Sequence, residues 1–168
     1  MRTSWFVRRA LVVVALIGLP AAVFAQTFPA GSGTLAGKAS LSIKGCGKGS
    51  DRGATSYTLD GAGSFVEDGS IAATAIPQGS SGRVFNLSYD AANLAIIRAI
   101  FEDVASEFCQ SQFTISSFQA SGSLKLNKRN TRAKVRQSAT LTGTDGVGGS
   151  HTGRFKAKDS GAWTLAVQ

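Results

Sequence analysis

The chain has 168 residues, including 18 Lys or Arg and ten Asp or Glu, so its formal net charge at neutral pH is +8. This length is ordinary for a single domain with one hydrophobic core. No segment approaches the ~20 consecutive apolar residues that a transmembrane helix needs. These properties exclude a helical membrane protein and favour one small basic domain.

Residues 1–25 have the organisation of a secretory signal peptide. Arg2, Arg8 and Arg9 form a basic start, residues 10–19 form an apolar run, and residues 23–25 form a small-residue cleavage site. We therefore expect export to the periplasm or the extracellular space, and a mature single β-rich domain of residues 26–168. The mature domain keeps 15 basic and ten acidic side chains, so it remains basic.

Short segments of alternating polarity follow the signal peptide. In residues 33–44, the apolar side chains of Leu35, Leu41 and Ile43 alternate with polar ones such as Lys38. Glycine and aspartate separate the segments, which is typical of strands joined by tight turns. The strands expected before residue 90 are 33–44, 56–60, 64–67, 71–76 and 83–89, with a polar turn at 45–53.

The period changes from two to between three and four at residues 91–108. Leu94, Ile97, Phe101 and Val104 recur at helical spacing, and charged side chains occupy the opposite face. Asp90 directly precedes this pattern and is a suitable N-cap residue. The segment is therefore predicted to be one amphipathic helix whose apolar face covers a sheet.

Alternating segments resume after the helix, at 112–118, 122–127, 132–142, 151–158 and 162–167, with a glycine-rich loop at 143–150. Consecutive short strands favour antiparallel pairing. The predicted fold class is mainly β: an antiparallel sheet of about eight strands, barrel-like or two-layered, with one amphipathic helix (about 91–108) covering it.

Cys46 and Cys109 are the two cysteines of the chain. In an oxidising compartment, an even pair is interpreted first as a disulfide. The alternative is a redox or metal-binding pair, but the chain has no CxxC spacing and His151 is its only histidine. We therefore predict a structural disulfide, no metal site and no cofactor.

Cations gather in the C-terminal half of the chain, on one side of three predicted strands. They alternate with apolar residues, so on neighbouring strands they would share one sheet face. The predicted binding residues are Lys125, Arg132, Lys134, Arg136, Arg154, Lys156 and Lys158. A transmembrane β-barrel would need an apolar outward face, which these cations contradict.

Two binding functions are compatible with this pattern. The first is recognition of an anionic partner by the basic face: a lipid headgroup, lipopolysaccharide, an acidic polysaccharide or an acidic protein. Nucleic acid is not expected, because the cations are not interleaved with aromatic side chains in the way that a stacking platform requires. The same cations could instead serve only solubility.

The alternative function is transport of a small apolar ligand inside a closed barrel. The apolar stripe of the predicted helix and six aromatic residues could line such a cavity, or could simply fill the core. The six are Phe65, Phe85, Phe113, Phe118, Phe155 and Trp163. No catalytic residue is predicted, because His151 is expected to be a lone exposed histidine and Glu102 a solvated helix residue. The sequence therefore predicts a non-enzymatic, exported cell-envelope protein.

Overall fold

The computed structural model describes residues 28–166, so the predicted signal peptide lies outside the described residues. The elements are β1 (Gly31–Ile43), β2 (Gly47–Leu59), β3 (Ser64–Glu67), β4 (Ile71–Pro77), β5 (Val84–Ser88), α1 (Ala91–Cys109), β6 (Phe113–Leu126), β7 (Arg132–Asp145), β8 (Ser150–Ala162) and β9 (Thr164–Leu165). All strand pairs are antiparallel. The predicted mainly β fold class with one helix is confirmed.

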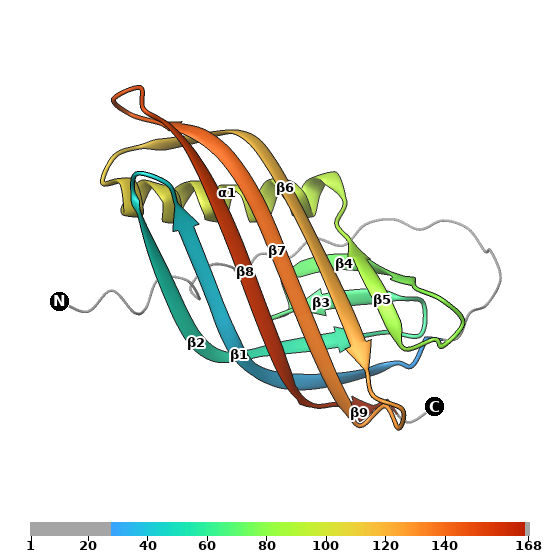
Figure 1. The fold of residues 1–168 in the computed structure, drawn as a ribbon. Coiled ribbons are helices and arrows are strands. Elements are labelled where there is room, and N and C mark those ends of the chain that lie inside the picture. Colours follow the sequence, from blue (N-terminus) through green and yellow to red (C-terminus); the bar gives the residue numbers. More distant parts are fainter. Residues whose placement is uncertain (1–27, 167–168) are drawn as a thin grey trace.

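Strands β1 to β8 close into a barrel (Figure 1). β1 closes the ring because it pairs along its whole length with β2 and, through Ala36–Ile43, with β8. β9 adds a short extra strand beside the start of β1. Of the two architectures compatible with the sequence, the barrel is the one that forms.

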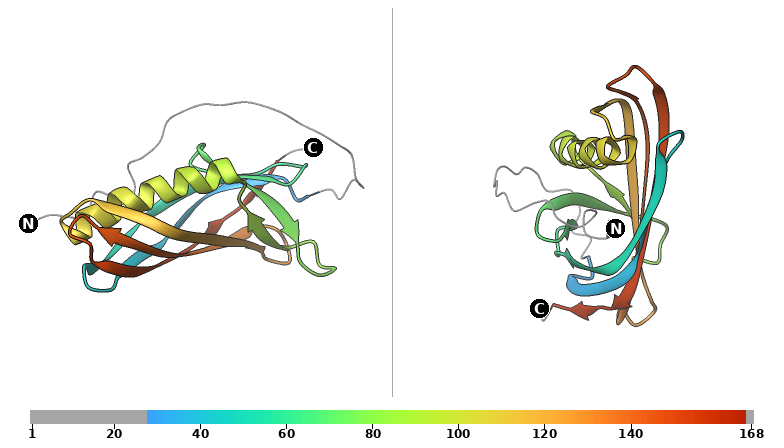
Figure 2. Two further views of the ribbon diagram at one scale, coloured as in Figure 1. Left: turned by 90° about the horizontal axis from the view of Figure 1, so that it is seen from above. Right: turned by 90° about the vertical axis from the view of Figure 1, so that its left-hand side faces the viewer.

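The barrel is fully hydrogen-bonded at only one end. β2 pairs with β3 through Tyr57–Leu59 alone, and β5 pairs with β6 through Val84–Leu87 alone. The first half of β2 and the first half of β6 therefore have no strand partner on these sides. Helix α1 lies across this seam, on the concave side of the long strands (Figure 2).

Polar side chains of α1 bond to the strand edges that the seam leaves unpaired. Glu102 Oε1 accepts a hydrogen bond from the Ile115 amide of β6 at 2.8 Å, and the Arg98 guanidinium donates to the Ile115 carbonyl. Asn93 Oδ1 accepts from the Ala72 amide of β4 at 2.9 Å. Such bonds give the backbone groups of Ile115 and Ala72 a partner, and so make these edges less available for pairing with another chain. The prediction that Glu102 is merely solvated is therefore wrong.

The ends of α1 are fixed by local chemistry. Asp90 is the N-cap and its carboxylate accepts from the Asn93 amide at 2.7 Å, as the sequence predicted. Gln110 ends the helix in a left-handed conformation with φ 52°. The sulfur atoms of Cys109 and Cys46 then join the helix end to the turn between β1 and β2, which confirms the predicted disulfide.

The apolar side chains form two separate clusters. The barrel cluster lies at the hydrogen-bonded end and includes Leu35, Tyr57, Phe65, Phe85 and Leu124. The helix cluster lies under α1 and includes Leu41, Ile43, Phe101, Phe113, Ile115 and Leu141. Because the two clusters are separate, large apolar side chains do not form one continuous core along the barrel.

Several predicted boundaries are wrong. Residues 47–53 belong to β2 and not to a turn. This part of the strand was missed because glycines occupy inward-facing positions, so the sequence shows no alternation of apolar and polar residues. The ring of Phe108 fills the space beside Gly49. Residues 113–126 form one strand with an irregularity between Ile115 and Ser117, not two strands. β7 and β8 are longer than predicted and shorten the expected loop at 143–150, and β8 continues to Ala162. Of the last predicted strand, 162–167, the described part contains β9 at Thr164–Leu165. Among residues 28–166, no helix is both long and apolar enough to cross a membrane.

Candidate functional site

Four inward-facing alanines lie in the middle of the long strands, and Ala139 and Ala120 adjoin the helix cluster. Ala39 of β1 lies opposite Ala157 of β8, and Ala120 of β6 lies opposite Ala139 of β7. Because alanine has no side chain beyond Cβ, these four positions leave the middle of the barrel unfilled. The result is a cavity of about 190 Å³ beneath α1, lined by all four alanines.

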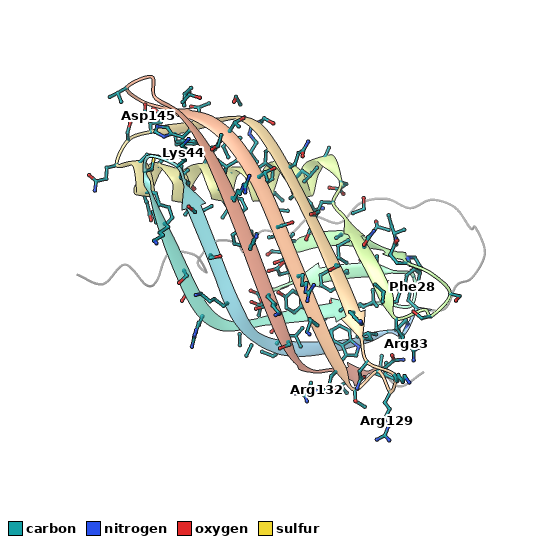
Figure 3. The ribbon with its side chains drawn as sticks, viewed as in Figure 1. Phe28, Lys44, Arg83, Arg129, Arg132 and Asp145 are labelled. Carbon is teal, nitrogen blue, oxygen red and sulfur yellow. A yellow bond between two sulfur atoms is a disulfide. The ribbon has the colours of Figure 1, made fainter. Side chains whose placement is uncertain are left out.

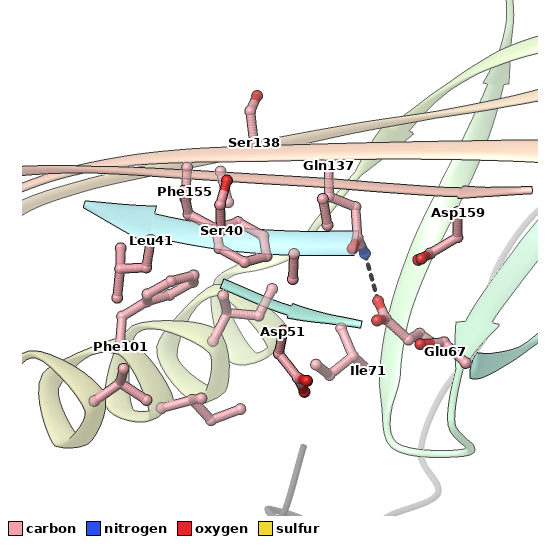
Figure 4. A pocket seen from close by; sticks show the side chains of 18 of the residues that line it. Ser40, Leu41, Asp51, Glu67, Ile71, Phe101, Gln137, Ser138, Phe155 and Asp159 are labelled. Atoms are coloured by element: carbon pink, nitrogen blue, oxygen red, sulfur yellow. Dashed lines mark hydrogen bonds between the residues drawn. The ribbon is translucent and has the colours of Figure 1, made fainter. Parts of the chain in front are cut away.

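One part of the cavity wall is apolar. Helix α1 contributes Ile97, Ile100, Phe101 and Val104, and the sheet contributes Leu41 and Phe155. The rings of Phe101 and Phe155 meet edge to face, with centroids 5.0 Å apart. Figure 4 shows Leu41, Phe101 and Phe155 grouped together at this side. The wall is suited to the body of an apolar molecule.

The other part of the wall is polar and hydrogen-bonded. The Gln137 amide donates to Glu67, as Figure 4 shows, and the Tyr57 hydroxyl donates to Asp159 Oδ2 at 2.6 Å. Asp159 is only 5% exposed. The carboxylates that line the cavity are those of Asp51, Glu67, Asp68 and Asp159, and neither Lys nor Arg stands among the described lining residues. This end of the cavity therefore has a negative potential.

Two tyrosines at this end are held in their protonated form. Burial, followed by the nearby Glu67 charge, raises the pKa of Tyr57 far above its ordinary value. Burial is also the main cause that raises the pKa of Tyr89 to about 12. Both phenols therefore remain neutral over the physiological pH range and keep a proton to donate.

The cavity opens beside β2. Asp68, on the turn between β3 and β4, lines the cavity and is exposed, and Gly49 and Asp51 line it from the part of β2 that does not pair with β3. The helix is bonded to β6 by side chains on the opposite side of the cavity. A ligand would therefore enter between α1, β2 and the β3–β4 turn.

The aromatic residues proposed from the sequence divide between cavity and core. Of the six, only Phe155 lines the cavity. Phe65, Phe85 and Trp163 are buried in the barrel cluster, Phe113 is buried in the helix cluster, and Phe118 packs against that cluster with its ring 5.5 Å from that of Phe101. The apolar helix stripe that was expected to line a cavity does so, through Ile97, Ile100, Phe101 and Val104. The four alanines were missed, and their only sequence signal is alanine at inward-facing strand positions.

The seven predicted cations lie where the alternation placed them. All are exposed, on the outer face of the neighbouring strands β6, β7 and β8. Lys125 lies opposite Lys134, and Arg136 lies opposite Lys158. The ion pairs found within residues 28–166 are Arg98–Glu102 and His151–Asp145, and neither involves this face. The binding role of the seven residues stays a prediction.

His151 is not the lone exposed histidine that the sequence suggested. Its Nε2 atom lies 2.9 Å from Asp145 Oδ2, its Nδ1 atom lies 2.9 Å from the Lys44 carbonyl, and Cys46 Sγ is 3.5 Å away. Figure 3 shows Lys44 and Asp145 at the same end of the sheet, with Arg129 and Arg132 at the other end. The contacts connect the β7–β8 turn to the β1–β2 turn and the disulfide.

This arrangement makes the stability of the protein depend on pH. Both neighbours of the ring accept hydrogen bonds, chiefly the Asp145 carboxylate, and they raise the pKa of His151 above its ordinary 6.5. The protonated ring therefore contributes stability that is complete below pH 6.5 and is lost as the pH rises through the raised pKa. The hydrogen bond from His151 lowers the pKa of Asp145, so the contribution of Asp145 is lost only in acid.

We expect wild-type protein to lose more unfolding free energy than His151→Gln when the pH rises from about 5.5 to about 9. Urea unfolding at the two pH values measures the difference, and the NMR titration of the single histidine measures its pKa directly. A pKa at or below 6.5 would contradict the expectation.

Together, the fold and the cavity define an antiparallel barrel that is closed by a helix over an interior site. No family model, no curated protein and no solved structure matches the chain.

Proposed function

We propose that this protein is an exported, non-enzymatic binding protein that carries a small, largely apolar molecule in the cavity beneath α1. The observation that carries the proposal is the cavity itself, with an apolar wall at one side and hydrogen-bonded polar groups at the other. Its volume of about 190 Å³ exceeds the roughly 150 Å³ of an engineered apolar cavity that binds benzene.

The polar end limits the chemistry of the ligand. A ligand head near Glu67 and Asp159 would meet carboxylates and the hydroxyl of Tyr89. Groups that donate hydrogen bonds or carry positive charge suit this potential, whereas an anionic head does not. We therefore favour an amphipathic ligand with an apolar body and a neutral or cationic head.

The carrier function predicts that filling the cavity abolishes binding. Ala157→Leu and Ala120→Leu each place a larger side chain in the empty space, so we expect probe affinity to fall at least tenfold, with stability unchanged or higher. N-phenyl-1-naphthylamine fluorescence measures binding, and urea unfolding measures stability. Ala36→Leu is the matched control, because Ala36 is exposed on β1.

Two results would overturn the carrier function. One is equal probe binding by wild type, the filled variants and the control. The other is binding of this uncharged probe that falls with added salt, since burial of an uncharged apolar molecule is insensitive to screening by salt. Native mass spectrometry of protein purified from its own source tests the same point, because a bound small mass should appear in wild type and be missing from Ala157→Leu.

We also propose a second binding function, recognition of an anionic partner by the outer face of β6, β7 and β8. The observation that favours it is the exposure of seven cations on three neighbouring strands. Like charges opposite one another in a sheet oppose folding, so a face that keeps them is suited to a partner of opposite charge. The two functions use opposite faces of the sheet.

A further inference from the structure

Four cations form a single row across four neighbouring strands. In the strand register, Arg52 of β2 lies opposite Lys38 of β1, Lys38 lies opposite Lys158 of β8, and Lys158 lies opposite Arg136 of β7. All four side chains are exposed. Neighbouring strands are ~4.8 Å apart, so the row extends over roughly 14 Å. Figure 1 views the sheet from this outer face, with α1 behind it.

The row adjoins a shallow groove on the outer face. Lys38, Arg136, Lys156 and Lys158 line the groove, together with Asn86 and the hydroxyl residues Ser40, Ser121, Ser123 and Ser138. The hydroxyls of Ser121 and Ser138 are 2.9 Å apart across β6 and β7. Ser40, Lys156, Ser138 and Ser121 form the next outward-facing row of the register, beside the cation row. The small hydroxyl side chains of this row allow a ligand to lie close to the sheet and next to the cations.

We propose that this groove binds a linear acidic polysaccharide. The inference rests on the second proposed function, binding of an anionic partner by the outer face, and names its partner. Charges arranged in a line suit a chain that carries sulfate or carboxylate groups at regular intervals, because charge-assisted hydrogen bonds from Lys and Arg can form along its length. The serine and asparagine side chains supply hydrogen bonds for sugar hydroxyls.

The other anionic partners fit less well. A membrane surface is broad and flat, whereas the cations border a groove and no aromatic side chain stands among its lining residues to insert between lipids. Single-stranded nucleic acid would be stacked on aromatic rings, which the described lining of the groove does not supply. The hydroxyl-rich lining favours a carbohydrate.

The test compares two variants that lose the same charge. Lys38→Gln with Lys158→Gln removes two cations from the row, and Lys128→Gln with Arg129→Gln removes two exposed cations from the β6–β7 turn. Binding of a size-defined heparin oligosaccharide is measured by isothermal titration calorimetry at two salt concentrations. We expect affinity to fall about tenfold in the row variant and less than twofold in the turn variant.

Stability measurements keep this comparison interpretable. Removing like charges that face each other across strands should leave the midpoint of thermal unfolding unchanged or higher, so the row variant is expected to fold. Weaker binding by a folded row variant, with weaker wild-type binding at higher salt, supports the groove. An equal loss in both variants would show dependence on net charge alone and would overturn the inference.

Binding to vesicles that contain anionic phospholipid distinguishes the polysaccharide inference from the more general proposal that the outer face binds an anionic partner. If wild type binds such vesicles, the row variant does not, and neither binds the oligosaccharide, the polysaccharide inference is wrong while the outer-face function stands. If wild type binds neither probe, both are wrong. Neither result affects the cavity, whose ligand is measured with an apolar probe.

Discussion

Replacing Cys46 and Cys109 together by serine is expected to lower the free energy of unfolding by about 4 kcal/mol. The two residues are 63 positions apart, so the bond removes much of the freedom of a long loop in the unfolded chain. It also fixes the end of α1 at the β1–β2 turn, where the first half of β2 has no strand partner other than β1. The measurement is urea unfolding of the oxidised protein and the double variant.

Reduced wild type is the control for this prediction. If the bond itself is responsible, reduced wild type and the double variant should unfold at the same urea concentration. In both proteins that lack the bond, amide exchange should be faster in the last turns of α1 than in β7. The reason is that the helix end would be released while the central strands remain paired. A difference in unfolding free energy below about 1 kcal/mol would contradict the prediction.

Phe101→Ala should lower the free energy of unfolding by about 3 kcal/mol or more. Phe101 is one of the two buried residues of α1, and its ring contacts those of Phe155 and Phe118, with centroids 5.0 Å and 5.5 Å away. It also lines the cavity, so its removal enlarges a space that is already unfilled. Urea unfolding measures the loss.

The same variant has an expected effect on binding. A larger cavity should accept bulkier apolar probes that wild type excludes, while the smallest probes should bind less tightly because they lose contacts with the ring. Phe101→Leu is the matched control, since it keeps most of the apolar volume and should have a smaller effect on both measurements. Equal stability of Phe101→Ala and wild type would contradict the packing described for α1.

Features that depend on local spacing were predicted well from the sequence. The helix was expected at about 91–108 and is observed at Ala91–Cys109. Asp90 was expected to cap it and does so. The outward placement of the cations on β6, β7 and β8 follows from an alternation of period two within each strand. Each of these predictions needed only neighbouring residues.

Features that depend on contacts between distant residues were not predicted. Lys38 and Arg52 join the cation row only because β1 pairs with both β2 and β8. The hydrogen bond between His151 and Asp145 depends on the shape of the β7–β8 turn, and the carbonyl of Lys44 reaches His151 from more than one hundred residues away in the chain. Glu102 and Arg98 bond to the backbone of Ile115 because the first half of β6 has no strand partner on that side. This unpaired edge exists only in the folded barrel.

The sequence by itself determined the mainly β class, the position of the helix and the pair of cysteines that forms the disulfide, because periodicity and composition are local properties of the chain. The tertiary structure alone decided that the sheet closes, that α1 covers a half-open seam and that four alanines from distant strands meet around a cavity. The physical reason is that a cavity is a property of packing. The alanines leave space only because strand register brings them to two successive levels of the barrel, Ala39 and Ala157 at one level and Ala120 and Ala139 at the next.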